Sequence, residues 1–321
     1  MLITNKELSS LLKRMNDIIE LYKETHSEKE RDYKTYEERL MSRIRTASRN
    51  LSPLIREACK SVKTSKRGKP PLLSIEKKTN ILLLKHLFDL SNRNMAYMLC
   101  FFSALTGIGT SFKTVERIYS NSYVKMALHN LFMLLLTKKG IKKVNASGDG
   151  TGYSLLISQH YNSNPKKKYS KKRKYRFSFA IIDLDTGMYV AFGTSMKSEK
   201  GAFNKAIELL GETGIEIESM RLDKYYSHSG ALDIFDEKAK IYLIPKKNAT
   251  IKGSYRWKRM LRELLDGTFS YLKEYYKRNN SESGISADKR LCGQIVHQKR
   301  EDRIETALFC TNLWHNITRL G

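Results

Sequence analysis

The feature that most constrains the fold is a change in the hydrophobic pattern near residue 141. Before it, apolar residues such as Leu11, Met15 and Ile18 recur at helical spacing. Beyond it, YRFSFAIIDLDTGMYVAFGTSM reads as two β-rich runs joined by the hairpin turn DLDTG, and IEIESMRLD and AKIYLIPKKN read as further strands. Helical segments separate these strands and long helices follow them. This order predicts an α/β fold in which helices flank a mixed sheet.

The same pattern predicts three parts along the chain. Residues 1–63 form a helical arm, residues 64–140 form a helical DNA-binding region, and residues 141–321 form the sheet-containing domain. The basic segment TSKRGKPPLLS, which contains Arg67 and Lys69, marks the first boundary because its glycine and prolines interrupt helices.

Residues 91–121 have the punctuation of a helix-turn-helix. Ser91 and Ser111 are suited to cap two helices, and Gly107 and Gly109 supply the turn between them. The second helix would carry Lys113, Thr114 and Arg117 on its outer side, where such side chains bind phosphates and base edges. A pair of core helices with one solvated face remains an alternative.

The net charge points to a polyanionic partner. The chain has 59 Lys and Arg against 33 Asp and Glu, a formal charge of +26. The apolar runs are too short to span a bilayer and no signal peptide is visible, so we expect a cytoplasmic, nucleoid-associated protein.

Two segments concentrate this charge. The first carries Lys167, Lys168, Lys171, Lys172, Arg173, Lys174 and Arg176. It is suited to follow a DNA backbone, although a solvated hairpin loop is the alternative. The second contains Lys246 and Lys247, together with Trp257, which we expect to pack in the core.

Three acids are candidate metal ligands. Asp149 is expected to follow a short strand and Asp223 to end another, and ligands collect at the carboxyl ends of strands in open α/β sheets. Glu282, brought by a helix, would complete a set of hard oxygen ligands for two Mg²⁺ or Mn²⁺ ions. Taken one at a time, Asp149 is also typical of a turn, Asp223 of a helix N-cap and Glu282 of a solvated helix face. Asp183 and Asp185 are assigned to the hairpin turn.

The segment EYYKRNNSESGISADKR places four functional side chains at helical spacing. Tyr275, Arg278, Glu282 and Lys289 follow one another at intervals of three, four and seven residues. At about 100° per residue they share one face of a helix over about 21 Å. The cations would then hold phosphates on both sides of a reacting one.

These motifs resemble those of the DDE transposases of prokaryotic insertion sequences. The four residues match the family signature Y-x2-R-x3-E-x6-K, and DGTGYS and LDKYYS resemble the motifs around the first and second aspartates. The resemblance covers residues 141–321. It implies an RNase H-like core in which Asp149, Asp223 and Glu282 bind two ions, with Lys289, Arg278 and Tyr275 beside them.

The function implied by the resemblance is DNA transposition. The chain would bind the terminal inverted repeats of its element and the target DNA, and cleave and transfer strands as a homodimer or larger assembly. Two alternatives stay open: a metal-dependent structure-specific nuclease, and a non-catalytic helix-turn-helix regulator.

Overall fold

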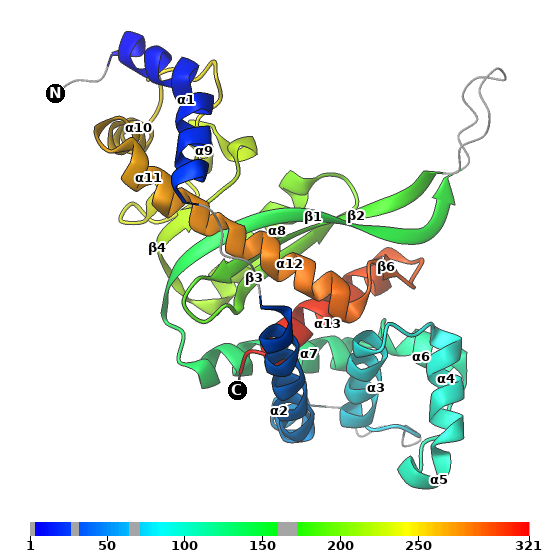
Figure 1. The fold of residues 1–321 in the computed structure, drawn as a ribbon. Helices are drawn as coiled ribbons and strands as arrows, with labels where there is room; N and C mark the ends of the chain where they lie inside the picture. The colour runs from blue at the N-terminus through cyan, green and yellow to red at the C-terminus, as the bar shows by residue number, and fades with distance from the viewer. Residues whose placement is uncertain (1–3, 27–31, 64–70, 160–171, 321) are drawn as a thin grey trace.

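The computed structural model describes residues 4–26, 32–63, 71–159 and 172–320. Up to residue 140 every described element is helical (Figure 1). The helices are α1 (Asn5–Thr25), α2 (Tyr33–Cys59), α3 (Ile75–Leu87), α4 (Asn92–Phe101), α5 (Ser103–Thr106), α6 (Phe112–Ile118) and α7 (Ser122–Lys139).

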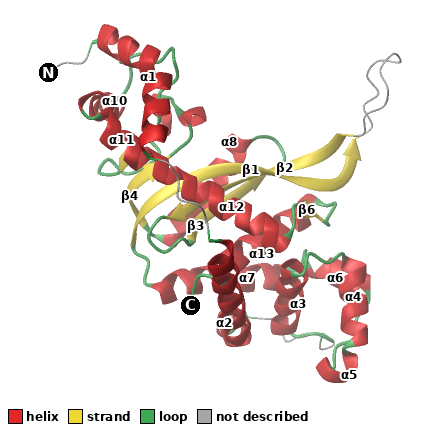
Figure 2. Cartoon of the chain, in the orientation of Figure 1, coloured by secondary structure: helices red, strands yellow, loops and turns green. Residues whose placement is uncertain are grey.

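The strands that follow form one mixed sheet (Figure 2). They are β1 (Lys143–Gln159), β2 (Lys172–Asp183), β3 (Tyr189–Ser195), β4 (Glu216–Arg221), β5 (Lys240–Tyr242) and β6 (Ile295–Val296). The order is β3-β2-β1-β4-β5, and β6 pairs separately with β1. The pairs β3–β2 and β2–β1 are antiparallel, whereas β4 and β6 run parallel to β1 and β5 runs parallel to β4.

Helices cover both faces of this sheet. The helices that follow β3 are α8 (Glu199–Thr213), η1 (Lys224–Tyr226), α9 (Ser229–Leu232), α10 (Tyr255–Asp266), α11 (Thr268–Tyr275), η2 (Tyr276–Arg278), α12 (Asn279–Cys292) and α13 (Glu301–Ile317). Helix α8 packs on β2 and β3, and α12 crosses β1 and β2 (Figure 1). The predicted α/β class, a mixed sheet with flanking helices that follows an all-helical region, is confirmed.

Strand β1 separates the two helical layers because its side chains alternate between them. On one face the Ser147 hydroxyl lies 3.0 Å from the Ser281 hydroxyl of α12. On the other, a Cβ at Gly148 would collide with Phe179, whose ring packs 5.1 Å from that of Phe203 on α8. Odd-numbered residues in this part of β1 therefore face α12 and even-numbered residues face α8.

The hairpin between β2 and β3 forms at the predicted turn. Asp183 Oδ2 accepts hydrogen bonds from the backbone N–H and the hydroxyl of Thr186, at 2.9 and 2.7 Å. Gly187 adopts φ 69°, which a residue without a Cβ tolerates. Asp183 is thus a turn residue, as expected from its sequence context.

The two N-terminal helices pack against different parts of the molecule. Helix α1 buries Leu8, Leu12 and Met15 and contacts α10 and α11, whereas α2 contacts α3 and α7 (Figure 1). The apolar stripe of each helix is therefore covered within the same chain. The domain boundaries after residues 63 and 140 stay predictions.

The helix-turn-helix pattern is present as α4, the short α5 and α6. The Ser91 and Ser111 hydroxyls accept hydrogen bonds from the N–H groups of Asn94 and Thr114, so both predicted caps form. Gly107 adopts φ 64° and ends α5.

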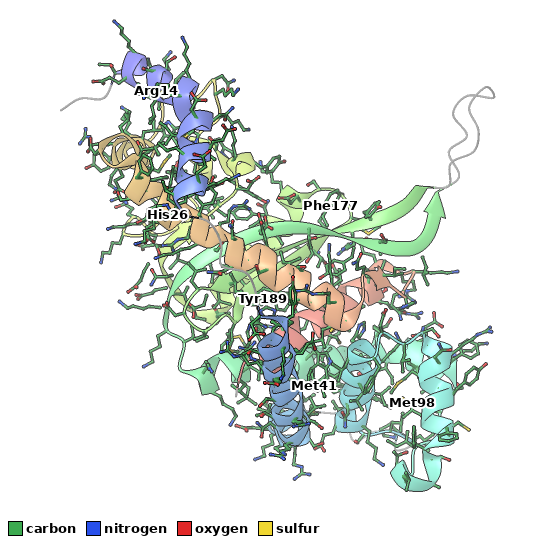
Figure 3. The ribbon with its side chains drawn as sticks, viewed as in Figure 1. Arg14, His26, Met41, Met98, Phe177 and Tyr189 are labelled. Carbon is green, nitrogen blue, oxygen red and sulfur yellow. The ribbon has the colours of Figure 1, made fainter. Side chains whose placement is uncertain are left out.

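A buried polar cluster fixes α12 on the sheet. Asp288 Oδ2 accepts a hydrogen bond from the Tyr189 hydroxyl at 2.5 Å, and Asp288 Oδ1 lies 2.7 Å from His315 Nδ1. The His315 ring of α13 stacks on the ring of Tyr189, which is labelled in Figure 3, with centroids 3.6 Å apart. Because buried polar groups are costly unless paired, this arrangement strongly restricts how α12 can sit.

One predicted DNA contact is instead part of the core. Arg176 is fully buried, and its guanidinium donates to Glu301 Oε1 and Glu305 Oε1 at 2.7 Å each and to the Thr194 hydroxyl at 3.0 Å. It joins β2 and β3 to α13. The prediction that Arg176 contacts DNA is wrong, because strand alternation directs its side chain inward.

Among the described residues, every helix is too short or too polar to cross a membrane.

The burial of Arg176 gives a testable consequence for stability. Arg176→Ala should lower the free energy of unfolding by about 3 kcal/mol, because it removes a buried side chain together with its hydrogen bonds to Thr194, Glu301 and Glu305. Lys174→Ala on the same strand is the matched control and should change it by less than about 0.5 kcal/mol. Denaturant unfolding measures both, and equal effects would contradict the structural role of Arg176.

Candidate active site

Asp149 lies inside β1, paired with Ala180 of β2. The expectation that it follows a short strand is wrong, because β1 continues through the glycine-rich segment around it. Glycine within a strand usually weakens it. Here the missing Cβ atoms of Gly148 and Gly150 leave room for side chains that pack closely on the α8 face. The Asp149 side chain, an odd-numbered position, faces α12.

Asp223 lies two residues beyond β4, at the carboxyl end of that strand. It is the N-cap of η1, and its Oδ2 accepts from the N–H of Tyr225 at 3.4 Å. This placement agrees with the sequence interpretation that Asp223 ends a strand before a helix.

Glu282 comes from the first turn of α12, and the rest of the predicted stripe lies along the same helical path. The path is continuous from α11 through the 3-10 turn η2 into α12. Tyr275 is buried at the end of α11, and the Arg278 guanidinium lies 5.9 Å from the centre of its ring. Tyr275 therefore supports Arg278 and is not part of an exposed polar surface.

The three carboxylates meet around Arg278. Its Nη1 lies 3.2 Å from Asp149 Oδ1, and its Nη2 lies 2.6 Å from Glu282 Oε1 and 4.0 Å from Asp223 Oδ1. One guanidinium thus holds acids from β1, from the turn after β4 and from α12. Residues up to 133 positions apart in sequence, Asp149 and Glu282, are brought to one point.

The pKa of Asp149 is shifted within this cluster of charges. Burial raises its pKa to about 6, and the nearby charges of Glu282 and Asp223 act in the same direction, while Arg278 opposes them. A carboxyl group with this pKa loses its proton close to neutral pH, as functional-site acids often do.

Lys289 lies farther along α12 and reaches β1. Its ammonium donates to the Thr151 hydroxyl at 2.6 Å and to the Gly152 carbonyl at 3.1 Å. Thr151 is two residues beyond Asp149 and, by alternation, on the same face of the strand. Arg278 and Lys289 are therefore both directed at β1, one at the carboxylates and the other beside them.

The donor set fits a hard divalent cation, since carboxylate oxygens are what Mg²⁺ and Mn²⁺ prefer. Within the part of the chain that the structure describes, no group of three His, Cys, Asp or Glu side chains is already disposed to hold an ion. Arg278 is instead the cation that offsets the charge of the three acids.

The predicted DNA contacts have mixed outcomes. On α6, Lys113 and Arg117 are exposed and Thr114 is half-buried, while Lys246 and Lys247 are exposed after β5. Lys174 is half-buried. The remaining predicted contacts lie outside the described residues or have side chains outside them: Arg67, Lys69, Lys167, Lys168, Lys171, Lys172 and Arg173.

Sequence reasoning missed two polar side chains close to the acids. Thr151, which receives Lys289, lies inside the DGTG segment, and its proximity to Asp149 was the available signal. Glu199 lies against Gly150 from the other face of β1. Nothing in its local sequence distinguishes it from other glutamates that follow a serine N-cap at the start of a helix.

Comparisons with known proteins agree with the motifs. No family model matches the chain. It is 44% identical over 316 residues to a probable transposase for insertion sequence element ISA1214 of Archaeoglobus fulgidus, covering 98% of this chain and 96% of that protein. The Mos1 mariner paired end complex with Mn is 11% identical, with 89% and 98% of the two chains covered, but the TM-score of 0.21 supports no argument. By its near full-length identity to the archaeal protein, the chain belongs to the family of insertion-sequence transposases.

Proposed function

We propose that this transposase cuts and rejoins DNA at the acidic site formed by Asp149, Asp223 and Glu282. The observation that carries the proposal is the meeting of these three carboxylates, from three separate elements, around one guanidinium. The family membership of the chain supports the same function.

The three acids would hold two Mg²⁺ or Mn²⁺ ions. When bound, such ions promote attack by water or a 3′-hydroxyl on a DNA phosphodiester and offset the negative charge on the leaving oxygen. The raised pKa of Asp149 matters here, because a carboxyl must release its proton before it can act as a ligand.

Two cations, Lys289 of α12 and Arg278 of η2, would orient the DNA. Lys289 is held beside Asp149 by Thr151, and its compact ammonium suits a phosphate oxygen. Arg278 is already clustered with the acids, and its planar fork suits a phosphate that approaches them. Tyr275, buried beneath Arg278, would hold that side chain in place.

Recognition of the element ends would use the helical region before residue 140, with the exposed Lys113 and Arg117 of α6 facing the duplex. The exposed Lys246 and Lys247 would add phosphate contacts near the sheet. A homodimer or larger assembly would hold two ends together, since joining both in one event needs two sites.

Removing any of the three carboxylates should stop the chemistry but not DNA binding. Asp149→Asn, Asp223→Asn and Glu282→Gln should each lower the single-turnover cleavage rate by at least about a thousandfold, because each removes a ligand charge from the metal site. The substrate is a duplex copied from the ends of the element, and binding is followed by gel shift.

The outcomes of that experiment separate the candidate functions. Full cleavage by any variant would remove that residue from the site. Cleavage without joined products in the parent protein would favour the structure-specific nuclease. Specific binding with no metal-dependent cleavage at all would favour the non-catalytic regulator.

The titration of Asp149 predicts an unusual stability effect in the absence of metal. Its folded pKa of about 6 lies above the ordinary value of 3.8, so its stabilising contribution is complete below pH 3.8 and is lost as pH rises through 6. Asp149→Asn should therefore be more stable than the parent by about 1–2 kcal/mol at pH 7.5, after allowance for solvent screening.

Denaturant unfolding in EDTA between pH 4 and pH 8 measures this difference. The advantage of Asp149→Asn should shrink towards zero at the acidic end. A variant less stable than the parent at pH 7.5 would mean that the pairing with Arg278 outweighs the burial of the carboxylate.

Lys289 and Arg278 should affect turnover more than binding. Lys289→Ala and Arg278→Ala should slow single-turnover cleavage by about tenfold or more, because positioning at the reacting phosphate is local while many other cations sustain affinity. Lys289→Arg should recover only part of the rate.

The exposed Lys258 of α10 offers a matched control, and Lys258→Ala should leave the rate unchanged. Rates are compared at saturating Mg²⁺ with all DNA bound. Values within about twofold of the parent for both alanine variants would show that these cations are not part of the machinery.

A further inference from the structure

The backbone ladder between β1 and β4 stops before it reaches the aspartates. Its last pair is Ser147 with Arg221, and Asp149 and Asp223 each lie two residues beyond. Parallel ladder hydrogen bonds therefore do not fix the distance between the two acidic segments. Arg278 offsets the repulsion between the two carboxylates on the α12 face, and a second contact joins the backbone segments that carry them.

A side-chain bridge joins the two segments on the opposite face of β1. The Tyr226 hydroxyl, three residues after Asp223, donates to Glu199 Oε1 at 3.1 Å. Glu199 is the first residue of α8 and rests directly against β1. A Cβ added to Gly150 would lie 2.4 Å from Glu199 Cδ and 2.5 Å from its Oε1.

The chemistry of the bridge favours a fixed geometry. Tyr226 is 3% exposed, and its ring packs against Phe179 and Phe203 with centroids 5.5 and 4.8 Å apart. Burial and then the charge of Glu199 raise the pKa of Tyr226, so the phenol remains a neutral donor at every working pH. Glu199 itself is half-buried. It is the first residue of α8, and the Ser198 hydroxyl caps this helix by accepting a hydrogen bond from the N–H of Gly201.

We propose that Glu199 is a positioning residue of the acidic site. Its carboxylate, held by Tyr226 and seated against Gly150, sets the spacing between Asp149 and Asp223 where the β1–β4 ladder has ended. The inference rests on the proposed function, because the spacing matters only if both aspartates serve one site. Glu199 does not face the carboxylates and acts through the backbone of β1.

This role explains why Asp149 is followed by glycine. Any larger residue at position 150 would push the Glu199 carboxylate away from the strand and from Tyr226. The effects of Gly150→Ala and Glu199→Ala should therefore not add, because each breaks the same contact.

The test uses the full-length protein with Glu199→Gln, Glu199→Ala, Tyr226→Phe, Gly150→Ala and the double variant Gly150→Ala/Glu199→Ala. Glu208→Ala, at an exposed position on the same helix, is the matched control. Two quantities are measured: the single-turnover cleavage rate on element-end DNA, and direct binding of Mn²⁺ without DNA by electron paramagnetic resonance. Unfolding midpoints report whether each variant is folded.

Glu199→Ala and Tyr226→Phe should each slow cleavage by about tenfold and weaken Mn²⁺ binding by about fivefold, since small misplacements of reacting groups are costly. Glu199→Gln keeps the acceptor for Tyr226 and should stay within about threefold of the parent in both quantities. The double variant should be no worse than Glu199→Ala, and Glu208→Ala should match the parent.

Two results would overturn the proposal. One is a rate and an Mn²⁺ affinity within about twofold of the parent for both Glu199→Ala and Tyr226→Phe. The other is damage by Glu199→Gln equal to that by Glu199→Ala, which would make the charge and not the hydrogen bond decisive. If Glu199→Ala does not fold, Glu199→Gln against Tyr226→Phe decides on the same criteria. The proposed function fails separately, if Asp149→Asn or Asp223→Asn still cleaves.

Discussion

The mutual repulsion of three carboxylates is the constraint around which the rest of the molecule is arranged. Asp149, Asp223 and Glu282 would separate if nothing opposed their charge, and Arg278 opposes it by contacting all three. Since the guanidinium belongs to the same helical path as Glu282, the path must cross β1 closely. The packing of α12 on the sheet therefore determines whether the acidic site exists.

Strand β1 converts that packing into a two-sided arrangement. Its residues facing α12, Asp149 and Thr151, meet Arg278 and Lys289, while Gly148 and Gly150 accept close neighbours from the α8 face. A strand rich in glycine is weak on its own. Here it is sustained by antiparallel pairing with β2, and the small residues give access to both sides of the backbone.

The positive charge of the chain is divided between structural and exposed roles. Arg176 and Arg278 are buried or nearly so and hold elements together, whereas Lys113, Arg117 and Lys246 remain exposed. The 59 Lys and Arg side chains thus have two roles: interior cations pair with carboxylates, and surface cations remain available for a polyanion. The density of positive charge along the sequence therefore does not show which cations are structural and which remain exposed.

The sequence by itself determined the fold class, the hairpin at Asp183 and the caps at Ser91 and Ser111, because these depend on periodicity and on contacts within a few residues. Spacing and motif resemblance also selected the three acids. Tertiary structure alone decided that β1 runs through Asp149, that Arg176 is buried and that Glu199 lies behind the site. Each of these depends on contacts with residues that are distant in the sequence, and the pattern of neighbouring residues does not specify such contacts.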